Sequence, residues 1–256
     1  QKAHVEAPTP ISVILAGILL KMGTYGFFRF SYPLFPEATI WFQPYMAILA
    51  VVGIVYGGFV ALAQTDFKKM VAYSSVSHMG FVLLGLAALT TKGMNGALLQ
   101  MFNHGCITGG LFLLVGVLYD RAHTRDMNSF GGISAQMPIY SGILIFFSLA
   151  SLGLPGLSGF VSEFLVLLGS YPYSKLFTGL ACIGIILAAT YLLLMIRRVL
   201  LGSLNSKWAS LPEINLREVI TLVPLMILVL GVGIYPKVIL KYLAPTLQAL
   251  LVNFGS

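Results

Sequence analysis

The stretch SLGLPGLSGFVSEFLVLLGSY, Ser151 to Tyr171, decides how the rest of the chain is interpreted. It lies in a strongly apolar region, yet it contains a proline, several glycines and one acidic side chain, Glu163. Proline and glycine interrupt helices. An interrupted helix leaves backbone amide and carbonyl groups that hydrocarbon cannot satisfy, so this stretch must face protein or water. The residues of the predicted break are Gly153, Pro155, Gly156 and Gly159.

The composition excludes a water-soluble fold. The 256 residues are 58% hydrophobic and only 9% charged, whereas soluble domains carry about 25% charged residues. Seven apolar stretches approach or exceed the roughly 20 residues that a helix needs to cross a bilayer. The sequence therefore predicts an all-α polytopic membrane protein, with residues 1–256 forming one transmembrane domain. The predicted spans are 11–30, 43–64, 70–90, 96–119, 138–169 (which holds the break), 176–200 and 217–240.

The net charge of +7 is interpreted as a topology signal. The basic residues lie at the ends of spans and form no clustered basic face, so we expect no nucleic-acid partner. If the spans alternate, one face collects nine lysines and arginines and the other collects five. The positive-inside rule then places the first face in the cytoplasm or the matrix of an organelle. That face holds Lys2, Lys68, Lys69, Arg121, Arg125, Arg197, Arg198, Lys207 and Arg217.

The sequence predicts no cofactor or metal in this chain. Two cysteines, Cys106 and Cys182, fall inside predicted spans without metal-ligand spacing, and we expect both to be small buried side chains. No glycine-rich dinucleotide loop is present. The chain starts at Gln1 without a signal peptide, so we expect it to be the later part of a longer chain.

Four acidic or basic side chains lie within predicted spans and away from the span ends: Lys21, His78, His104 and Glu163. A charged group at the bilayer centre costs about 2.5 to 3.5 kcal/mol on insertion scales. Each group taken singly has a structural explanation, because a histidine can simply pack and Lys21 could pair with Glu163 to hold helices together. An acid, a base and two imidazoles beside a broken helix instead favour a proton or cation path near the membrane midplane.

Helical spacing surrounds these groups with polar side chains. Gln100, His104 and Thr108 recur every four residues and form one polar stripe. Two serines lie three and four residues before His78 and share its face. Histidine titrates close to neutral pH, and burial changes the proton affinity of acids and amines. A row of such groups bridged by water can pass a proton in steps.

Several motifs closely resemble the antiporter-like proton-pumping subunits of respiratory complex I, NADH:quinone oxidoreductase. The motifs, in order, are AHVEAPTPISVILAGILLKMGTYGFFRF, AQTDFKKMVAYSSVSHMGFVLLG, GVLYDRAHTRDM and LGLPGLSGFVSEFLVL. The resemblance runs over nearly the whole chain. It implies the last seven spans of a fourteen-span subunit: a lysine-bearing helix, the second five-helix repeat with its interrupted helix, and a final helix.

The resemblance also implies roles for the intramembrane groups. Lys21 matches the central lysine of the family, His78 and His104 match its bridging histidines, and Glu163 matches the terminal acid of the broken helix. An acid at the last position favours the branch called subunit 4 or chain M, because most sister subunits carry lysine there. The first repeat, with its own glutamate and lysine, would precede Gln1.

The resemblance implies a proton-translocating subunit in an energy-transducing membrane, bacterial, mitochondrial or thylakoid. NADH, FMN, iron–sulfur clusters and quinone would be bound by other subunits. The expected partners are lipid, neighbouring antiporter-like subunits of complex I and a segment that supplies the missing half. Two alternatives remain open: a cation/proton antiporter or membrane-bound hydrogenase subunit of the same superfamily, and a structural membrane module whose buried charges lock helices together.

Overall fold

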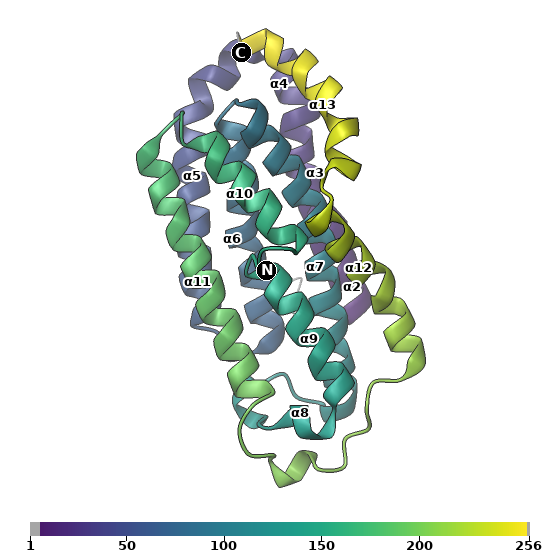
Figure 1. Cartoon of the computed structure of the whole chain (residues 1–256). Helices are drawn as coiled ribbons and strands as arrows, with labels where there is room; N and C mark the ends of the chain where they lie inside the picture. The colour runs from purple at the N-terminus through teal and green to yellow at the C-terminus, as the bar shows by residue number, and fades with distance from the viewer. Residues whose placement is uncertain (1–5, 255–256) are drawn as a thin grey trace.

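The computed structural model describes residues 6–254, which form an all-α structure (Figure 1). The only β pairing among these residues is a single bridge between Asp66 and Asp126. Six helices are long and apolar enough to cross a membrane, and two shorter apolar helices accompany them. The prediction of an all-α membrane protein is confirmed.

The six long spans follow the apolar stretches of the sequence. The first, Thr9–Leu34, is assembled from α2 (Thr9–Ile14), α3 (Leu20–Gly26) and α4 (Tyr32–Leu34), joined by two π-helical turns, η1 (Leu15–Leu19) and η2 (Phe27–Ser31). The others are α5 (Pro36–Leu62), α6 (Phe67–Ala87), α7 (Thr91–Ala122), α11 (Lys175–Val199) and α12 (Leu216–Ile234). Side chains cap several of these helices: Asp66 caps α6, Thr90 caps α7 and Ser174 caps α11.

Helices α6 and α7 form the interior of the bundle. Within their most apolar windows 78% and 83% of the residues are buried, against 22% in the first span and in α12. In Figure 1 α5 and α11 lie on one side of α6, and α12 lies on the other side of α7. The short helices α9 (Pro138–Ser151) and α10 (Ser158–Ser170) lie across the front. The polar side chains in the middle of α6 and α7 therefore face protein, whereas Lys69, Lys92 and Asp120 near the helix ends are exposed.

The predicted break separates α9 from α10. The backbone leaves the helix after Ser151, and Gly153 and Gly156 adopt φ values of 85° and 94°, which favour glycine. Two close approaches fix the break against its neighbours. A side chain at Gly159 would overlap the Ala150 carbonyl, and one at Gly233 of α12 would meet the backbone of Gly156.

The end of the molecule that carries the predicted positive face holds the longer connections. These contain η3 (Met127–Ser129), α8 (Ile133–Gln136) and η4 (Ser206–Trp208). Figure 1 shows α8 and the loop before α12 together at the lower end.

Three expectations need correction. The second span begins at Pro36, seven residues before the predicted start at residue 43. The predicted span 217–240 is not one helix: α12 ends at Ile234, and a further helix, α13 (Lys237–Leu251), follows and leads into η5 (Val252–Phe254). The chain bends there because Pro236 has no amide donor and restricts the residue before it. Cys182 is exposed, whereas Cys106 is buried as expected.

Candidate functional site

Four different helices bring the predicted intramembrane groups to one place. Lys21 comes from α3, His78 from α6, His104 from α7 and Glu163 from α10, one and a half turns after the break. Lys21 is 7% exposed, and the other three are 3% exposed. The groups therefore face each other inside the bundle and not the lipid.

Lys21 contacts His104. The lysine Nζ lies 2.6 Å from the His104 Nδ1 and also donates to the carbonyl of Ala16, five residues earlier. This carbonyl belongs to the π-helical turn η1, directly before α3. Such wide turns occur mostly as single turns inside α-helices, often at functional sites. The ring's other nitrogen, Nε2, lies 3.2 Å from the Thr108 hydroxyl.

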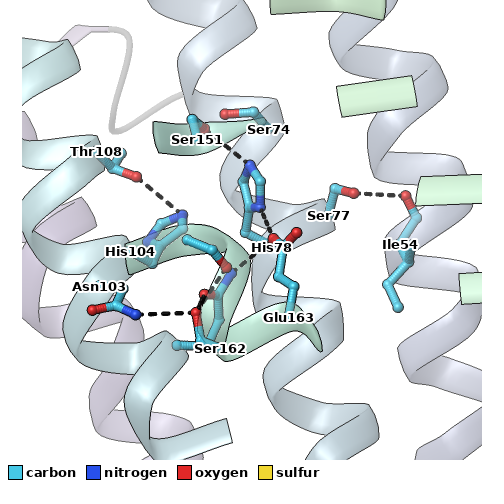
Figure 2. Close-up of polar contacts among 12 residues, drawn as sticks. Ile54, Ser74, Ser77, His78, Asn103, His104, Thr108, Ser151, Ser162 and Glu163 are labelled. Carbon is cyan, nitrogen blue, oxygen red and sulfur yellow. Dashed lines mark hydrogen bonds and ion pairs between the residues drawn. The ribbon is translucent and has the colours of Figure 1, made fainter. Parts of the chain in front are cut away.

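His78 contacts Glu163, as Figure 2 shows. The His78 Nδ1 lies 2.8 Å from the Glu163 Oε1, and the same oxygen accepts a hydrogen bond of 2.9 Å from the Gln100 amide. The ring's Nε2 lies 3.2 Å from the Ser151 hydroxyl and 3.3 Å from the Tyr191 hydroxyl. Both ring nitrogens of His78 therefore have polar partners, on opposite sides of the ring.

The two contacts are separated by a short gap. The centroids of the His78 and His104 rings are 5.6 Å apart. A cavity of about 10 Å³ lies between them, lined by His78, His104, Glu163, Thr108 and Ser151 among others. About this volume is needed to hold one water molecule, provided that polar partners surround it. A single water could thus join the two pairs.

The polar side chains predicted to surround the four groups contact different partners. In the stripe on α7, Thr108 contacts His104, whereas Gln100 contacts Glu163. The two serines before His78 both donate to the Val71 carbonyl of their own helix. Within residues 6–254 Lys21 and Glu163 make no direct ion pair, since each contacts a different histidine.

Several polar residues of the site were not singled out from the sequence. They are Asn103, Ser151, Ser162 and Tyr191, all buried. Asn103 and Ser162 connect α7 to the start of α10. Asn103 had one usable signal, because an amide next to His104 in an apolar helix needs a partner. Tyr191 lies on α11, far along the chain, and carried no comparable signal.

A second polar cluster lies near the predicted positive face. Arg121, at the end of α7, donates to both carboxylate oxygens of Glu218, at 3.0 and 2.7 Å, and to the carbonyls of Pro212 and Glu213. The Glu213 carboxylate accepts from two amides in the first turn of α9, at Ile139 and Tyr140. We call Arg121, Glu213 and Glu218 the arginine clamp, because they tie α7, α9 and α12 together.

The donor set at the centre suits protons. No group of three or more histidine, cysteine, aspartate or glutamate side chains in the described part of the chain could hold a metal ion. The centre instead offers an amine, two imidazoles and a carboxylate in two hydrogen-bonded pairs.

Comparison with known proteins decides the family. The family model described as "NADH:quinone oxidoreductase/Mrp antiporter, TM" matches residues 1–204. This chain belongs to that family. NADH-quinone oxidoreductase subunit M of Rhodobacter capsulatus is 46% identical over 253 residues, which are 98% of this chain and 49% of that protein. NADH-ubiquinone oxidoreductase chain 4 of Marchantia polymorpha is 47% identical over 241 residues, 94% of this chain and 49% of that protein.

A solved structure shows the same fold. One chain of respiratory complex I from Thermus thermophilus with bound NADH matches with a TM-score of 0.87 and 35% identity, over 93% of this chain and 50% of that chain. This member of the NADH:quinone oxidoreductase/Mrp antiporter family thus spans about half the length of the relatives that it matches.

Proposed function

We propose that this chain conducts protons in the membrane arm of an NADH:quinone oxidoreductase, through Lys21, His104, His78 and Glu163. One observation carries the proposal: four titratable groups from four helices form two close pairs, and a water-sized cavity separates the pairs. Histidine can accept a proton at one ring nitrogen and release another from its second nitrogen.

We propose an order of transfer that these contacts support. Lysine in its charged form is only a donor, so the His104 Nδ1 accepts from Lys21, and the ring proton lies on Nε2, toward Thr108. A proton that moves from Nζ to Nδ1 makes His104 an imidazolium, which can release its Nε2 proton toward the cavity. His78 can accept at Nε2, beside Ser151, and release from Nδ1 to Glu163.

The similarity to complex I subunits supports a role coupled to redox chemistry that occurs elsewhere. We propose that the redox cofactors and the quinone are bound by other subunits. We also propose that neighbouring membrane subunits, together with a segment equivalent to the rest of the relatives' length, complete the path. Transfer of charge from that segment to Lys21 would begin the sequence on this side.

The test is Glu163→Gln in membranes that contain the assembled complex. The amide keeps the size and polarity of the side chain but cannot bind and release a proton. We expect NADH-driven proton pumping per assembled complex to fall at least tenfold. Glu37→Gln, in the first turn of α5, is the matched control and should pump normally. Near-normal pumping by the Glu163→Gln complex would contradict the proposal, and sodium-dependent transport without NADH would favour an antiporter.

A further inference from the structure

Glu163 has a second hydrogen-bond partner that lies outside the Lys–His–Glu path. The Nε2 of Gln100 lies 2.9 Å from the Glu163 Oε1, the oxygen that also contacts His78. Gln100 is only 2% exposed. A buried amide beside a carboxylate can present its nitrogen, which donates a hydrogen bond to the carboxylate, or its oxygen, which cannot donate.

A chain of hydrogen bonds fixes which end of the amide faces Glu163. It starts at the Ser158 carbonyl in the first turn of α10, which can only accept, so the Asn103 Nδ2 at 2.7 Å must donate to it. The same nitrogen lies 3.1 Å from the Ser162 Oγ. Ser162 therefore accepts from Asn103. Its single proton has three acceptors within reach, the Gln100 Oε1 at 2.5 Å and the carbonyls of Gly159 and Ser158 at 3.0 and 3.2 Å, and the shortest contact is the one to Gln100. With its oxygen held in this way, Gln100 turns its nitrogen toward Glu163.

The fixed direction has an electrostatic consequence. The Glu163 Oε1 accepts from two N–H groups, one of Gln100 and one of His78. Hydrogen bonds donated to a carboxylate favour its ionised form over its protonated form. They are also stronger than hydrogen bonds between neutral groups. Gln100 thus opposes transfer of the proton from His78 to Glu163.

We propose that Gln100 is a positioning residue that sets how readily Glu163 takes a proton, and that Ser162 and Asn103 hold it in the donating orientation. This inference rests on the proposed function, because Glu163 is the last proton acceptor of that path and the inference concerns how readily Glu163 takes a proton. It also links this property of Glu163 to the helix break, since the hydrogen-bond chain begins at Ser158, the first residue of α10.

The test is the pH profile of NADH-driven pumping in the assembled complex. Gln100→Leu removes the donated hydrogen bond, so Glu163 holds its proton to higher pH. We expect the alkaline limb of the profile to move upward by about one pH unit, because a hydrogen bond to a charged group accounts for roughly a tenfold change in proton affinity. Ser162→Ala frees the amide to rotate and should move the profile in the same direction by less.

A matched control separates this effect from loss of packing. Gln43 on α5 also donates an amide hydrogen bond, 2.7 Å long and partly buried, but to the Ala87 carbonyl. Gln43→Leu should leave the profile where it is. An unchanged profile in Gln100→Leu, or an equal shift in Gln43→Leu, overturns the inference. If Gln100→Leu does not assemble, Ser162→Ala decides, and an unshifted profile in that variant overturns the inference.

The inference and the proposed function fail in different ways. Normal pumping by Glu163→Gln would contradict the proton path itself. Loss of pumping by Glu163→Gln together with an unshifted Gln100→Leu profile would contradict only the role of Gln100. In a double variant that combines Glu163→Gln with Gln100→Leu, any residual pumping should have the same pH profile as in Glu163→Gln alone, because the carboxylate on which Gln100 acts has been removed.

Discussion

The central pair His78–Glu163 and the arginine clamp use similar contacts for different purposes. Each joins a nitrogen base to a carboxylate, at 2.8 Å in the centre and 2.7 Å in the clamp. Counted over side-chain atoms alone, His78 and Glu163 are each 4% exposed, whereas Arg121 and Glu218 are 11% and 23% exposed. The chemical difference decides the role, because a guanidinium keeps its proton whereas an imidazole titrates near neutral pH.

The surroundings of the two sites also differ: those of Arg121 fix helix ends, and those of the central site leave space for water. Arg121 donates to carboxylate oxygens and backbone carbonyls from three segments, which fixes the ends of α7 and α12. The central site instead has a cavity of about 10 Å³ beside two rings that each have polar partners at both nitrogens. The comparison shows what a buried pair of base and acid needs for proton transfer. The base must be able to release its proton, and a cavity that can hold water must lie beside it.

The largest effect should come from making the central base unable to titrate. His78→Gln can still donate to Glu163 and occupies a similar volume, but it cannot carry a proton. We expect proton pumping to fall at least tenfold while the amount of assembled complex stays close to normal. Pumping is measured in inverted membrane vesicles and expressed per assembled complex. Retention of more than half of the pumping would remove the distinction between the two sites.

Replacement of Arg121 in the arginine clamp should affect the assembly of the complex and not its pumping. Arg121→Leu leaves the partly buried Glu218 without its bidentate partner, and hydrogen bonds to charged groups contribute about 1.5 to 3 kcal/mol each before solvent screening. We expect a lower yield of assembled complex and a lower unfolding temperature. Pumping per assembled complex should stay within about twofold of normal. A clamp variant that assembles fully but does not pump would show that Arg121 belongs to the transfer path.

Among the central residues, the smaller effect on pumping should come from Thr108→Val, which removes only the hydroxyl 3.2 Å from the His104 Nε2. The replacement keeps the shape of the side chain. The cavity still has Ser151 and both histidines as polar partners, so we expect a loss of pumping of about two- to threefold. A tenfold loss would mean that the hydroxyl itself carries the proton, and no loss would mean that His104 releases its proton elsewhere.

The sequence predicted which residues form the central site but not which of them contact one another. Lys21, His78, His104 and Glu163 were identifiable because ionisable groups inside apolar spans are costly and rare. Which of them touch depends on how four helices are rotated and shifted against one another, and spacing within one helix does not determine that. A direct Lys21–Glu163 pair was one expectation, whereas the structure gives each of these residues its own histidine.

Other features had weaker signals in the sequence. Arg121 and Glu218 are 97 positions apart, and the charges alone indicated only the topology of the chain. The π-helical turns around Lys21 follow from no residue pattern that we recognise. The Ser162 hydroxyl lies 3.0 Å from the Gly159 carbonyl of its own helix, a local contact typical of helical serines, and its shorter contact with Gln100 on another helix could not be predicted from spacing. By contrast, Pro155 and its glycines located the break, because few residues adopt the backbone angles found there.

The most direct test of the account fills the gap between the two pairs without touching any titratable group. Ala150 is fully buried and lines the cavity, so Ala150→Val adds two methyl groups where a water molecule would connect His104 to His78. Ala181→Val, at a fully buried alanine of α11 outside this cavity, controls for overpacking. We predict that Ala150→Val lowers pumping per assembled complex at least tenfold, whereas Ala181→Val does not. Normal pumping by an assembled Ala150→Val complex would contradict transfer through this cavity.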